Sequence, residues 1–442
     1  MDQFTASLWG DEAWAATLAV KPIWQIVTIV ARDTSPPLYY LLLHTWMKIF
    51  GTGEIAIRSL SFLFFLATVL VVYLIGKHLW DKQSLISGEN KKTALFAALF
   101  TFLNPFLFQY GFEGRMYSLL LLTTTLSMYF YLRKNQLGYI FSTIAALYTH
   151  HFSIFVIFVQ FLWSLREVKK ETFFSFLKPY FIIGLAYLPW LYPLYYQTSL
   201  VSSGFWLGKP NLKTIGDLFS NFFLGASIHP LQLAVLLAFV FLFLLRSWGE
   251  WKKEKLILAW AFIPIVLTFF ISQLKSSIFY DRYLLFCLPP QVLLLVSRRR
   301  AASLTFIFLA IFSLIIIDWH YFTHPIKRPF KELATYVKQN KKPDFGLINY
   351  NGKAHHLFES KYYGLSAPIY VPQGSLPFYA GTALMDKKDI LNILPDKEKI
   401  MVISSEDPEK TYLCGYSLEQ KVKFDSLYLL WFKKEKFGCP CG

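Results

Sequence analysis

Residues 58 to 78 read RSLSFLFFLATVLVVYLIGKH, and no charged side chain lies between Arg58 and Lys77. A run of about 17 to 25 apolar residues is long enough to cross the hydrocarbon core of a bilayer as a helix. The whole chain shares this character, because 55% of its 442 residues are hydrophobic, only 16% are charged, and the mean hydropathy is +0.40. Soluble domains carry about 25% charged residues. The sequence therefore predicts an integral membrane protein.

Similar apolar runs recur along the chain and predict about ten membrane spans of a polytopic α-helical protein. The aromatic content of 19%, with 13 Trp and 26 Tyr, is typical of a chain with many residues at lipid headgroup interfaces. After the first span, at 58 to 78, the predicted spans cover residues 93 to 109, 116 to 132, 137 to 150, 152 to 165, 173 to 193, 230 to 246, 256 to 273, 283 to 297 and 302 to 318.

The basic residues form short clusters between these spans, and their placement predicts the topology. When the spans alternate, every cluster falls on one side, which the positive-inside rule makes the cytoplasm. The net charge of +16 is explained by this pattern, so we exclude nucleic acid as a partner and expect a multi-pass protein of the cell membrane. The clusters lie at 76 to 92, 133 to 136, 166 to 171, 246 to 255 and 297 to 300.

Residues 36 to 50, PPLYYLLLHTWMKIF, predict a helix that lies along the outer membrane surface. Fifteen residues are short for a span, they include His44 and Lys48, and the proline pair suits a helix N-terminus. This places residues 1 to 57 outside with no upstream apolar run to export them. Either the first span inserts with a translocated tail, or the protein has a further helix upstream; both alternatives stay open.

After residue 319 the composition changes to that of a small α/β domain on the outer side. Runs of strand length lie at 345 to 350, 367 to 372, 399 to 405 and 426 to 434, and an amphipathic helix is predicted at 329 to 340. The chain thus divides into a first outer loop (1 to 57), a transmembrane domain (58 to 318) and an outer domain (319 to 442). A disulfide can form among Cys414, Cys439 and Cys441, but the spacing of these residues does not show which two are paired.

Four motifs follow one another on the outer side: LWGDEAW at 8 to 14, DTSPPLYYLLLHTWMKIFG at 33 to 51, NPFLFQYGFEGRMY at 104 to 117 and YDRYLLFCLP at 280 to 289. In this order they resemble the GT-C glycosyltransferases that use lipid-phosphate sugars, namely the protein O-mannosyltransferase family and its bacterial relatives, including lipid A aminoarabinose transferases. The resemblance covers residues 7 to about 320. Two departures are the missing first transmembrane helix and Ser35, where the family has His before its proline pair.

The resemblance implies which residues carry the activity. Asp11 and Glu12 match the family's acidic catalytic pair, Pro36 and Pro37 its Pro-Pro motif, Glu113 its second acidic loop and Arg282 its phosphate-binding arginine. The implied reaction transfers a hexose or pentose, with inversion, from a polyprenyl phosphate to an acceptor on the outer side of the cell envelope.

The chemistry of the residues fits this implication. A sugar on a polyprenyl phosphate has its anomeric carbon at the membrane surface, so the catalytic groups must lie at that height. Transfer needs a base for the acceptor hydroxyl and positive charge for the leaving phosphate. Asp11 is our candidate for the first role, and Arg282, with Arg115, for the second, because a guanidinium matches phosphate oxygens with two donors. Secondary candidates are Asp33, Glu54, Glu113, His150 and His151.

Several properties stay open. The sugar, the acceptor (a protein, lipid or glycan) and the oligomeric state are not fixed by the sequence. A divalent metal cofactor is also undecided, with Glu113 as its candidate ligand. The sequence does predict two partners, the polyprenyl-phosphate sugar donor and the membrane lipid itself.

Structural roles compete with each catalytic one. Asp11 and Glu12 are also the residue types that cap a helix, here one starting near Ala13, and Asp33 can cap the helix after the proline pair. Ion pairs are alternatives for the others: Glu113 with Arg115, Arg282 with Asp281, and Glu54 with Arg58, while His150 and His151 can be plain interface residues.

The main alternative function is a lipid-linked sugar transporter or flippase without transferase activity. Such a protein would carry ionisable residues within its spans, lining a path. The predicted spans are nearly free of them, which favours the transferase.

Overall fold

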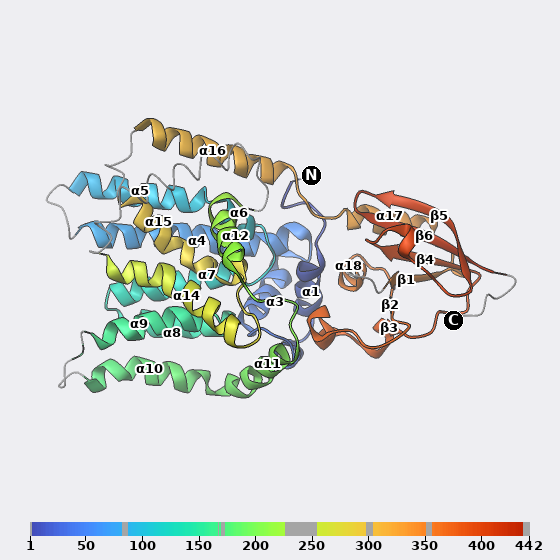
Figure 1. Cartoon of the computed structure of the whole chain (residues 1–442), viewed down its shortest axis with the longest axis horizontal. Helices are drawn as coiled ribbons and strands as arrows, with labels where there is room; N and C mark the ends of the chain where they lie inside the picture. Colours follow the sequence, from blue (N-terminus) through green and yellow to red (C-terminus); the bar gives the residue numbers. More distant parts are fainter. Residues whose placement is uncertain are drawn as a thin grey trace. The chain divides into compact units, whose positions relative to one another are not determined.

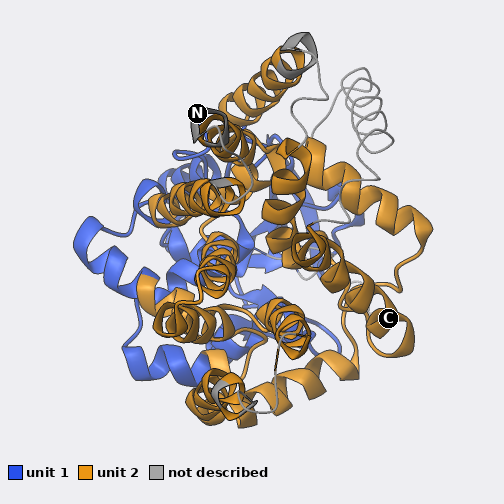
Figure 2. Cartoon of the chain, turned by 90° about the vertical axis from the view of Figure 1, so that its left-hand side faces the viewer, with its two compact units in different colours: residues 1–29, 43–57, 325–442 blue, residues 30–42, 58–324 orange. Residues whose placement is uncertain are grey.

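The computed structural model describes residues 2–81, 87–166, 168, 173–225, 254–297, 304–350 and 356–435. The chain forms two compact units, which Figure 2 shows in different colours. Unit 1 comprises Met1–Ile29, Leu43–Ile57 and Pro325–Gly442, and unit 2 comprises Val30–Leu42 and Arg58–His324. The first 57 residues are therefore shared between the two units.

Unit 2 is built from helices, most of which run roughly parallel to one another in Figure 1. Helix α7 packs against α8 and α9, α8 against α10, and α14 against α9 and α15. The helices are α4 (Glu54–Asp81), α5 (Ser87–Phe102), α6 (Pro105–Gly111), α7 (Tyr117–Leu132), α8 (Gln136–Thr149), α9 (Ser153–Leu165), α10 (Phe173–Tyr187), α11 (Leu191–Ser203), α12 (Leu212–Leu224), α14 (Lys255–Leu274), α15 (Leu288–Val296) and α16 (Leu304–Thr323), with short 3₁₀ turns η2 (Leu188–Trp190), η4 (Asp281–Tyr283) and η5 (Leu285–Cys287).

The ten predicted spans are not confirmed as membrane-crossing helices. Within the described residues, Glu54–Trp80 and Lys255–Leu274 are long and apolar enough to cross a membrane, and a third span results if Lys91–Phe102 and Pro105–Gly111 count as one. Other predicted spans do contain helices, but α7, α8 and α9 have 16, 14 and 13 residues. At 1.5 Å per residue these measure about 20 to 24 Å, less than the roughly 30 Å of a hydrocarbon core.

Proline explains where two of the predicted spans are divided. Asn104 and Pro105 separate α5 from α6, which are bent by 63°, and the Asn104 side chain caps the new helix by accepting from the Leu107 N–H at 2.9 Å. Pro189 lies in the η2 turn between α10 and α11. The predicted span at 230 to 246, the basic clusters at 169 to 170, 252 to 253 and 298 to 300, and Cys439 and Cys441 lie outside the described residues.

Unit 1 contains the predicted α/β domain, whose sheet has the strand order β3-β2-β1-β4-β6-β5. The first four strands in this order are parallel, whereas β6 and β5 are antiparallel additions joined by a tight turn in which Asp425 adopts a positive φ of 48°. The strands are β1 (Gly346–Tyr350), β2 (Ile369–Tyr370), β3 (Ile390–Leu391), β4 (Lys399–Ser404), β5 (Tyr416–Phe424) and β6 (Leu427–Lys434).

Both faces of this sheet are buried. Helix α17 (Phe330–Asn340), predicted at 329 to 340, places Phe330, Leu333 and Val337 against one face. The opposite face buries Ile348, Val402, Leu430 and other apolar residues. Cys414 forms a disulfide bond, and Cys287 of unit 2 is a buried free thiol.

The N-terminal helices α1 (Gly10–Ala19), α2 (Ile23–Ala31) and α3 (Leu38–Phe50) precede α4. Helix α1 packs against α18 (Leu357–Tyr362) of the α/β domain, and two pieces of the first outer loop, Met1–Ile29 and Leu43–Ile57, belong to the same unit as the last 118 residues. The predicted helix at 36 to 50 is confirmed as α3, in which the buried His44 makes a 2.7 Å hydrogen bond through Nδ1 with the Ala19 carbonyl. Its position along a membrane surface stays a prediction.

Candidate functional site

The turn that carries Arg282 is fixed by Asp281. The Asp281 carboxylate accepts hydrogen bonds from the Arg282 backbone N–H at 2.6 Å and from the Asn221 side chain on α12 at 2.8 Å. An acid at the start of a 3₁₀ turn satisfies an N–H that the turn itself leaves unpaired. Asp281 therefore has a structural role in holding the arginine in place.

The guanidinium of Arg282 lies within a cluster of tyrosine rings. Its central carbon is 4.9 Å from the ring centre of Tyr280, 5.3 Å from that of Tyr117 and 5.7 Å from that of Tyr283. Rings at this range attract a cation through their electron-rich faces. A guanidinium can also donate two N–H groups to one anion with several oxygens.

His150 lies beside the same rings and close to both arginines. Its ring centre is 5.1 Å from that of Tyr283 and 6.4 Å from that of Tyr117. Burial holds the pKa of His150 well below its usual value, and the positive charges of Arg115 and Arg282 depress it further. The imidazole is therefore neutral, and the positive charge of this cluster resides on the two guanidinium groups.

Glu113 and Arg115 belong to the turn between α6 and α7. The Arg115 N–H donates to the Glu113 carbonyl at 2.7 Å, and the Ser61 hydroxyl on α4 donates to the Arg115 carbonyl at 3.4 Å. Glu113 is buried, whereas Arg115 is half-buried. The pKa of Tyr280 is raised chiefly by burial, and the negative charges of Asp281 and Glu113 add to that shift. Unit 2 thus brings together four of the predicted residues, Arg282, Arg115, Glu113 and His150, in what we call the tyrosine–arginine cluster.

His151 connects this region to the loop that precedes the proline pair. Its Nε2 lies 2.7 Å from Oε1 of Gln197 on α11, and Gln197 Nε2 donates to the carbonyls of Val30 at 2.8 Å and Ser35 at 3.3 Å. Because the Gln197 amide nitrogen is committed to two carbonyls, its oxygen must accept, and His151 Nε2 must carry the proton. His151 Nδ1 then accepts from the Tyr187 hydroxyl at 3.3 Å.

Burial lowers the pKa of His151 to about 4. In the unfolded chain histidine titrates near pH 6.5, so between about pH 6.5 and 4 the unfolded state binds more protons and stability falls as the pH falls. We expect His151→Asn to flatten this pH dependence. Across the whole range, the change in the free energy of unfolding that His151 causes is on the order of 3 kcal/mol. Thermal unfolding of both proteins between pH 4 and 8 tests this; identical slopes would show that His151 does not cause the acid sensitivity.

In unit 1, the buried carboxylate of Glu12 is enclosed within the structure. Helix α1 begins at Gly10 rather than near Ala13, so Glu12 lies in its first turn. Glu12 Oε2 accepts from Lys327 Nζ at 2.9 Å and from the Trp9 backbone N–H at 3.4 Å. The second contact is the backward half of a capping box. The capping role considered for this acid is therefore present, together with an ion pair to a distant lysine.

Asp11, the neighbour of Glu12, is partly exposed. The helix that carries it is held by Trp14, whose indole donates to the Gly381 carbonyl at 3.4 Å. Gly381 has a φ of +81°, and a Cβ there would lie 2.8 Å from the Trp14 ring, so only glycine fits against this helix. Asp11 thus lies, partly exposed, on a helix with a rigid support.

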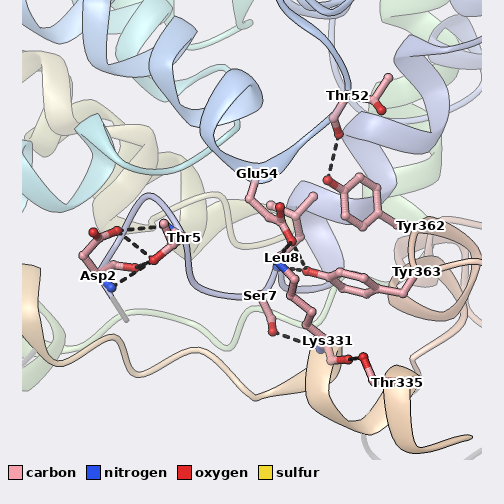
Figure 3. Close-up of polar contacts among 10 residues, drawn as sticks. All are labelled: Asp2, Thr5, Ser7, Leu8, Thr52, Glu54, Lys331, Thr335, Tyr362 and Tyr363. Atoms are coloured by element: carbon pink, nitrogen blue, oxygen red, sulfur yellow. Dashed lines mark hydrogen bonds and ion pairs between the residues drawn. The ribbon is translucent and has the colours of Figure 1, made fainter. Parts of the chain in front are cut away.

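Glu54 joins the first outer loop to the α/β domain (Figure 3). Its Oε1 accepts from the Tyr363 hydroxyl at 3.1 Å and lies 3.4 Å from Lys331 Nζ. Tyr363 in turn accepts from the Leu8 N–H at 2.9 Å, and Ser7 accepts from the Lys331 N–H at 3.0 Å. These contacts give Glu54 a structural role within unit 1.

No protein-family model and no curated protein sequence matches the chain. Among solved structures, ArnT from Cupriavidus metallidurans in the apo state has a TM-score of 0.66 at 12% identity, covering 99% of this chain and 96% of that chain. ArnT from the same organism bound to undecaprenyl phosphate has a TM-score of 0.63 at 11% identity, with the same coverage.

The chain has the ArnT fold. The resemblance to lipid-phosphate-sugar transferases that the motifs indicated is thus confirmed at the level of the fold, and it extends over the α/β domain as well as the helical one. Within the described part of the ArnT-like chain, no group of three or more His, Cys, Asp or Glu side chains is arranged to hold a metal ion. A metal at Glu113 stays a prediction.

Two residues of the cluster, Tyr280 and Tyr283, were not among the candidates chosen from the sequence. They flank Arg282 in YDRY, and this spacing of two rings around one arginine was a usable signal. Gln197 gave no such signal, because its contact with Val30 spans 167 residues of sequence.

Proposed function

We propose that this chain is a membrane glycosyltransferase that takes a sugar from a polyprenyl-phosphate carrier and passes it to a hydroxyl of a protein, lipid or glycan. The observation that carries the proposal is the Arg282 guanidinium, stacked among three tyrosines with Arg115 close by. Support also comes from the ArnT fold, since one ArnT structure contains undecaprenyl phosphate. Two arginines that match phosphate oxygens are the chemistry that such a carrier requires.

In this reaction the bond between the anomeric carbon and the phosphate oxygen breaks, and a bond to the acceptor oxygen forms. The electron pair of the broken bond stays on the phosphate, where the guanidinium of Arg282 stabilises the added negative charge. The proton of the acceptor hydroxyl passes to a carboxylate. We propose Asp11 for this step, because it is a partly exposed residue on a helix with rigid support and matches the acidic catalytic position of the motif.

The other candidates receive narrower roles in the proposal. Neutral His150 and His151 offer hydrogen bonds without adding charge, and Glu113 is the second choice for a base, because it lies in the tyrosine–arginine cluster. Asp33 remains a further candidate. We place the active site and the α/β domain on the outer side of a multi-pass membrane protein.

Transfer of label from a lipid donor tests the proposal. Sealed right-side-out vesicles that contain the protein and the acceptors of its native membrane are given undecaprenyl phosphate bearing a radiolabelled sugar, and the label is expected to pass from this carrier to another molecule. A transporter would move the intact donor to the other leaflet and leave the label on the undecaprenyl phosphate. Release of label only in inverted vesicles would contradict the orientation but not the transferase activity.

One observation favours keeping the transporter as the second candidate. Asp318 is 5% exposed in the apolar helix α16, and neither of its carboxylate oxygens has a hydrogen-bond partner in the structure. Ionisable side chains within apolar helices often line transport paths. Movement of labelled donor between leaflets without release of the sugar would favour this alternative.

A further inference from the structure

One exposed aromatic residue stands next to the tyrosine–arginine cluster in unit 2. Trp206, in the segment between α11 and α12, is 47% exposed. Its ring centre is 5.2 Å from that of Tyr280, and the two rings are nearly perpendicular at 85°. Tyr280 itself contacts the guanidinium of Arg282 at 4.9 Å. The indole is therefore separated from the phosphate-binding group by a single tyrosine ring.

Hydrogen bonds attach this segment to the end of α14, and the end of α11 to the loop that leads to Tyr280. Lys209 Nζ donates to the Gln273 carbonyl at 3.1 Å, Gln273 Nε2 donates to the Pro210 carbonyl at 2.5 Å, and Ser276 Oγ donates to the Ser202 carbonyl at 3.5 Å. Contacts thus occur on both sides of Trp206 in the sequence. An exposed indole that is held in place loses little entropy when a ligand covers it.

We infer that Trp206 is a specificity-determining residue that stacks on the sugar of the lipid-phosphate donor, a pyranose with an apolar C–H face. This inference rests on the proposed function. A sugar attached to a phosphate on the Arg282 guanidinium would lie within reach of Tyr280 and of the Trp206 ring that contacts Tyr280. Aromatic walls with a few polar groups are typical of small-molecule sites. Asp281, whose carboxylate accepts from the Asn221 side chain, is a polar residue directly next to Tyr280 in the sequence.

The alternative explanation for the exposed Trp206 ring is that it anchors the protein to the membrane surface, and this explanation predicts a different binding result. Tryptophan is enriched at membrane interfaces, where it anchors a protein to headgroups regardless of any substrate. An anchor would affect every lipid ligand equally, whereas a sugar platform distinguishes the glycosylated carrier from the bare one. Tyr195 on α11, 75% exposed, is the matched control, because its removal deletes an exposed ring of the same unit.

The experiment measures binding by the full chain in lipid nanodiscs. The probes are undecaprenyl phosphate and undecaprenyl phosphate bearing glucose, mannose or aminoarabinose, and wild type is expected to bind at least one glycosylated form more tightly than the bare carrier. Trp206→Ala should weaken that form about fivefold to tenfold and leave the bare carrier unchanged, while Trp206→Phe retains most of the affinity. Tyr195→Ala should change neither.

Equal weakening of both ligands, no change in either, or a wild type that prefers none of the glycosylated forms would overturn the inference. The proposed function is judged separately by Arg282→Ala. If that variant binds bare undecaprenyl phosphate as wild type does, the phosphate site itself is wrong, whatever Trp206 does.

Discussion

Replacing Asp11 with Asn is expected to lower sugar transfer at least about 100-fold, since a catalytic proton acceptor contributes about 10²- to 10⁴-fold to rate. The amide keeps the shape of the side chain but cannot take a proton. A charge near the start of α1 is worth at most about 1 kcal/mol of stability, so the variant should fold and bind donor normally. Release of label from the lipid donor, measured per folded molecule, gives the result.

Glu12→Gln is the matched control, because it makes the same chemical change on the adjacent residue. Glu12 is buried against Lys327 and accepts the Trp9 N–H. We therefore expect the opposite outcome, a loss of about 1 to 3 kcal/mol in the free energy of unfolding with turnover of the folded fraction nearly unchanged. If Asp11→Asn retains turnover near that of wild type, Asp11 is only a helix-terminus residue and Glu113 or Asp33 becomes the base.

Arg282→Ala is expected to weaken binding of undecaprenyl phosphate by roughly 10- to 100-fold, because hydrogen bonds to charged groups contribute about 1.5 to 3 kcal/mol. Arg282→Lys keeps the charge but loses the two-donor geometry and the planar stacking on Tyr280, so an intermediate affinity is expected. Titration of the nanodisc-embedded protein with the carrier measures both.

Arg166→Ala is the control for general effects of losing a stacked arginine. Its guanidinium lies 4.9 Å from the ring centre of Trp163, the same range as Arg282 over Tyr280, at the end of α9 and outside the tyrosine–arginine cluster. Carrier affinity should be unchanged in this variant. An Arg282→Ala protein that binds the carrier as tightly as Arg166→Ala would remove Arg282 from the site.

The sequence predicted elements well where burial is periodic. The amphipathic pattern at 329 to 340 corresponds to α17, and the apolar runs at 345 to 350, 399 to 405 and 426 to 434 correspond to β1, β4 and β6. Strand β5 was missed because it lies at the sheet edge, where SLEQK faces solvent and shows no alternation. The break within the predicted span at 93 to 109 was missed, because hydropathy does not show that Asn104 and Pro105 end one helix and begin another.

The candidate site was predictable only in part. Its charged residues lie in short motifs, so Arg282, Arg115 and Glu113 could be found one by one. Their partners depend on contacts between residues far apart in sequence, such as Glu12 with Lys327, 315 positions away, and no local pattern indicates such a pair. The tertiary fold, not propensity, decides these roles.

The composition of unit 1 has a consequence for biosynthesis. Its first pieces, Met1–Ile29 and Leu43–Ile57, are synthesised before Arg58–His324, but their partners begin only at Pro325. Leu8 meets Tyr363 across 355 positions. At about 5 to 20 residues per second, the ribosome needs roughly 13 to 53 s to make the intervening chain. During that interval α1, with its acidic pair, lacks the surface that holds it, and a nascent chain stopped before Pro325 would expose Trp14 and its apolar neighbours to chaperones and proteases.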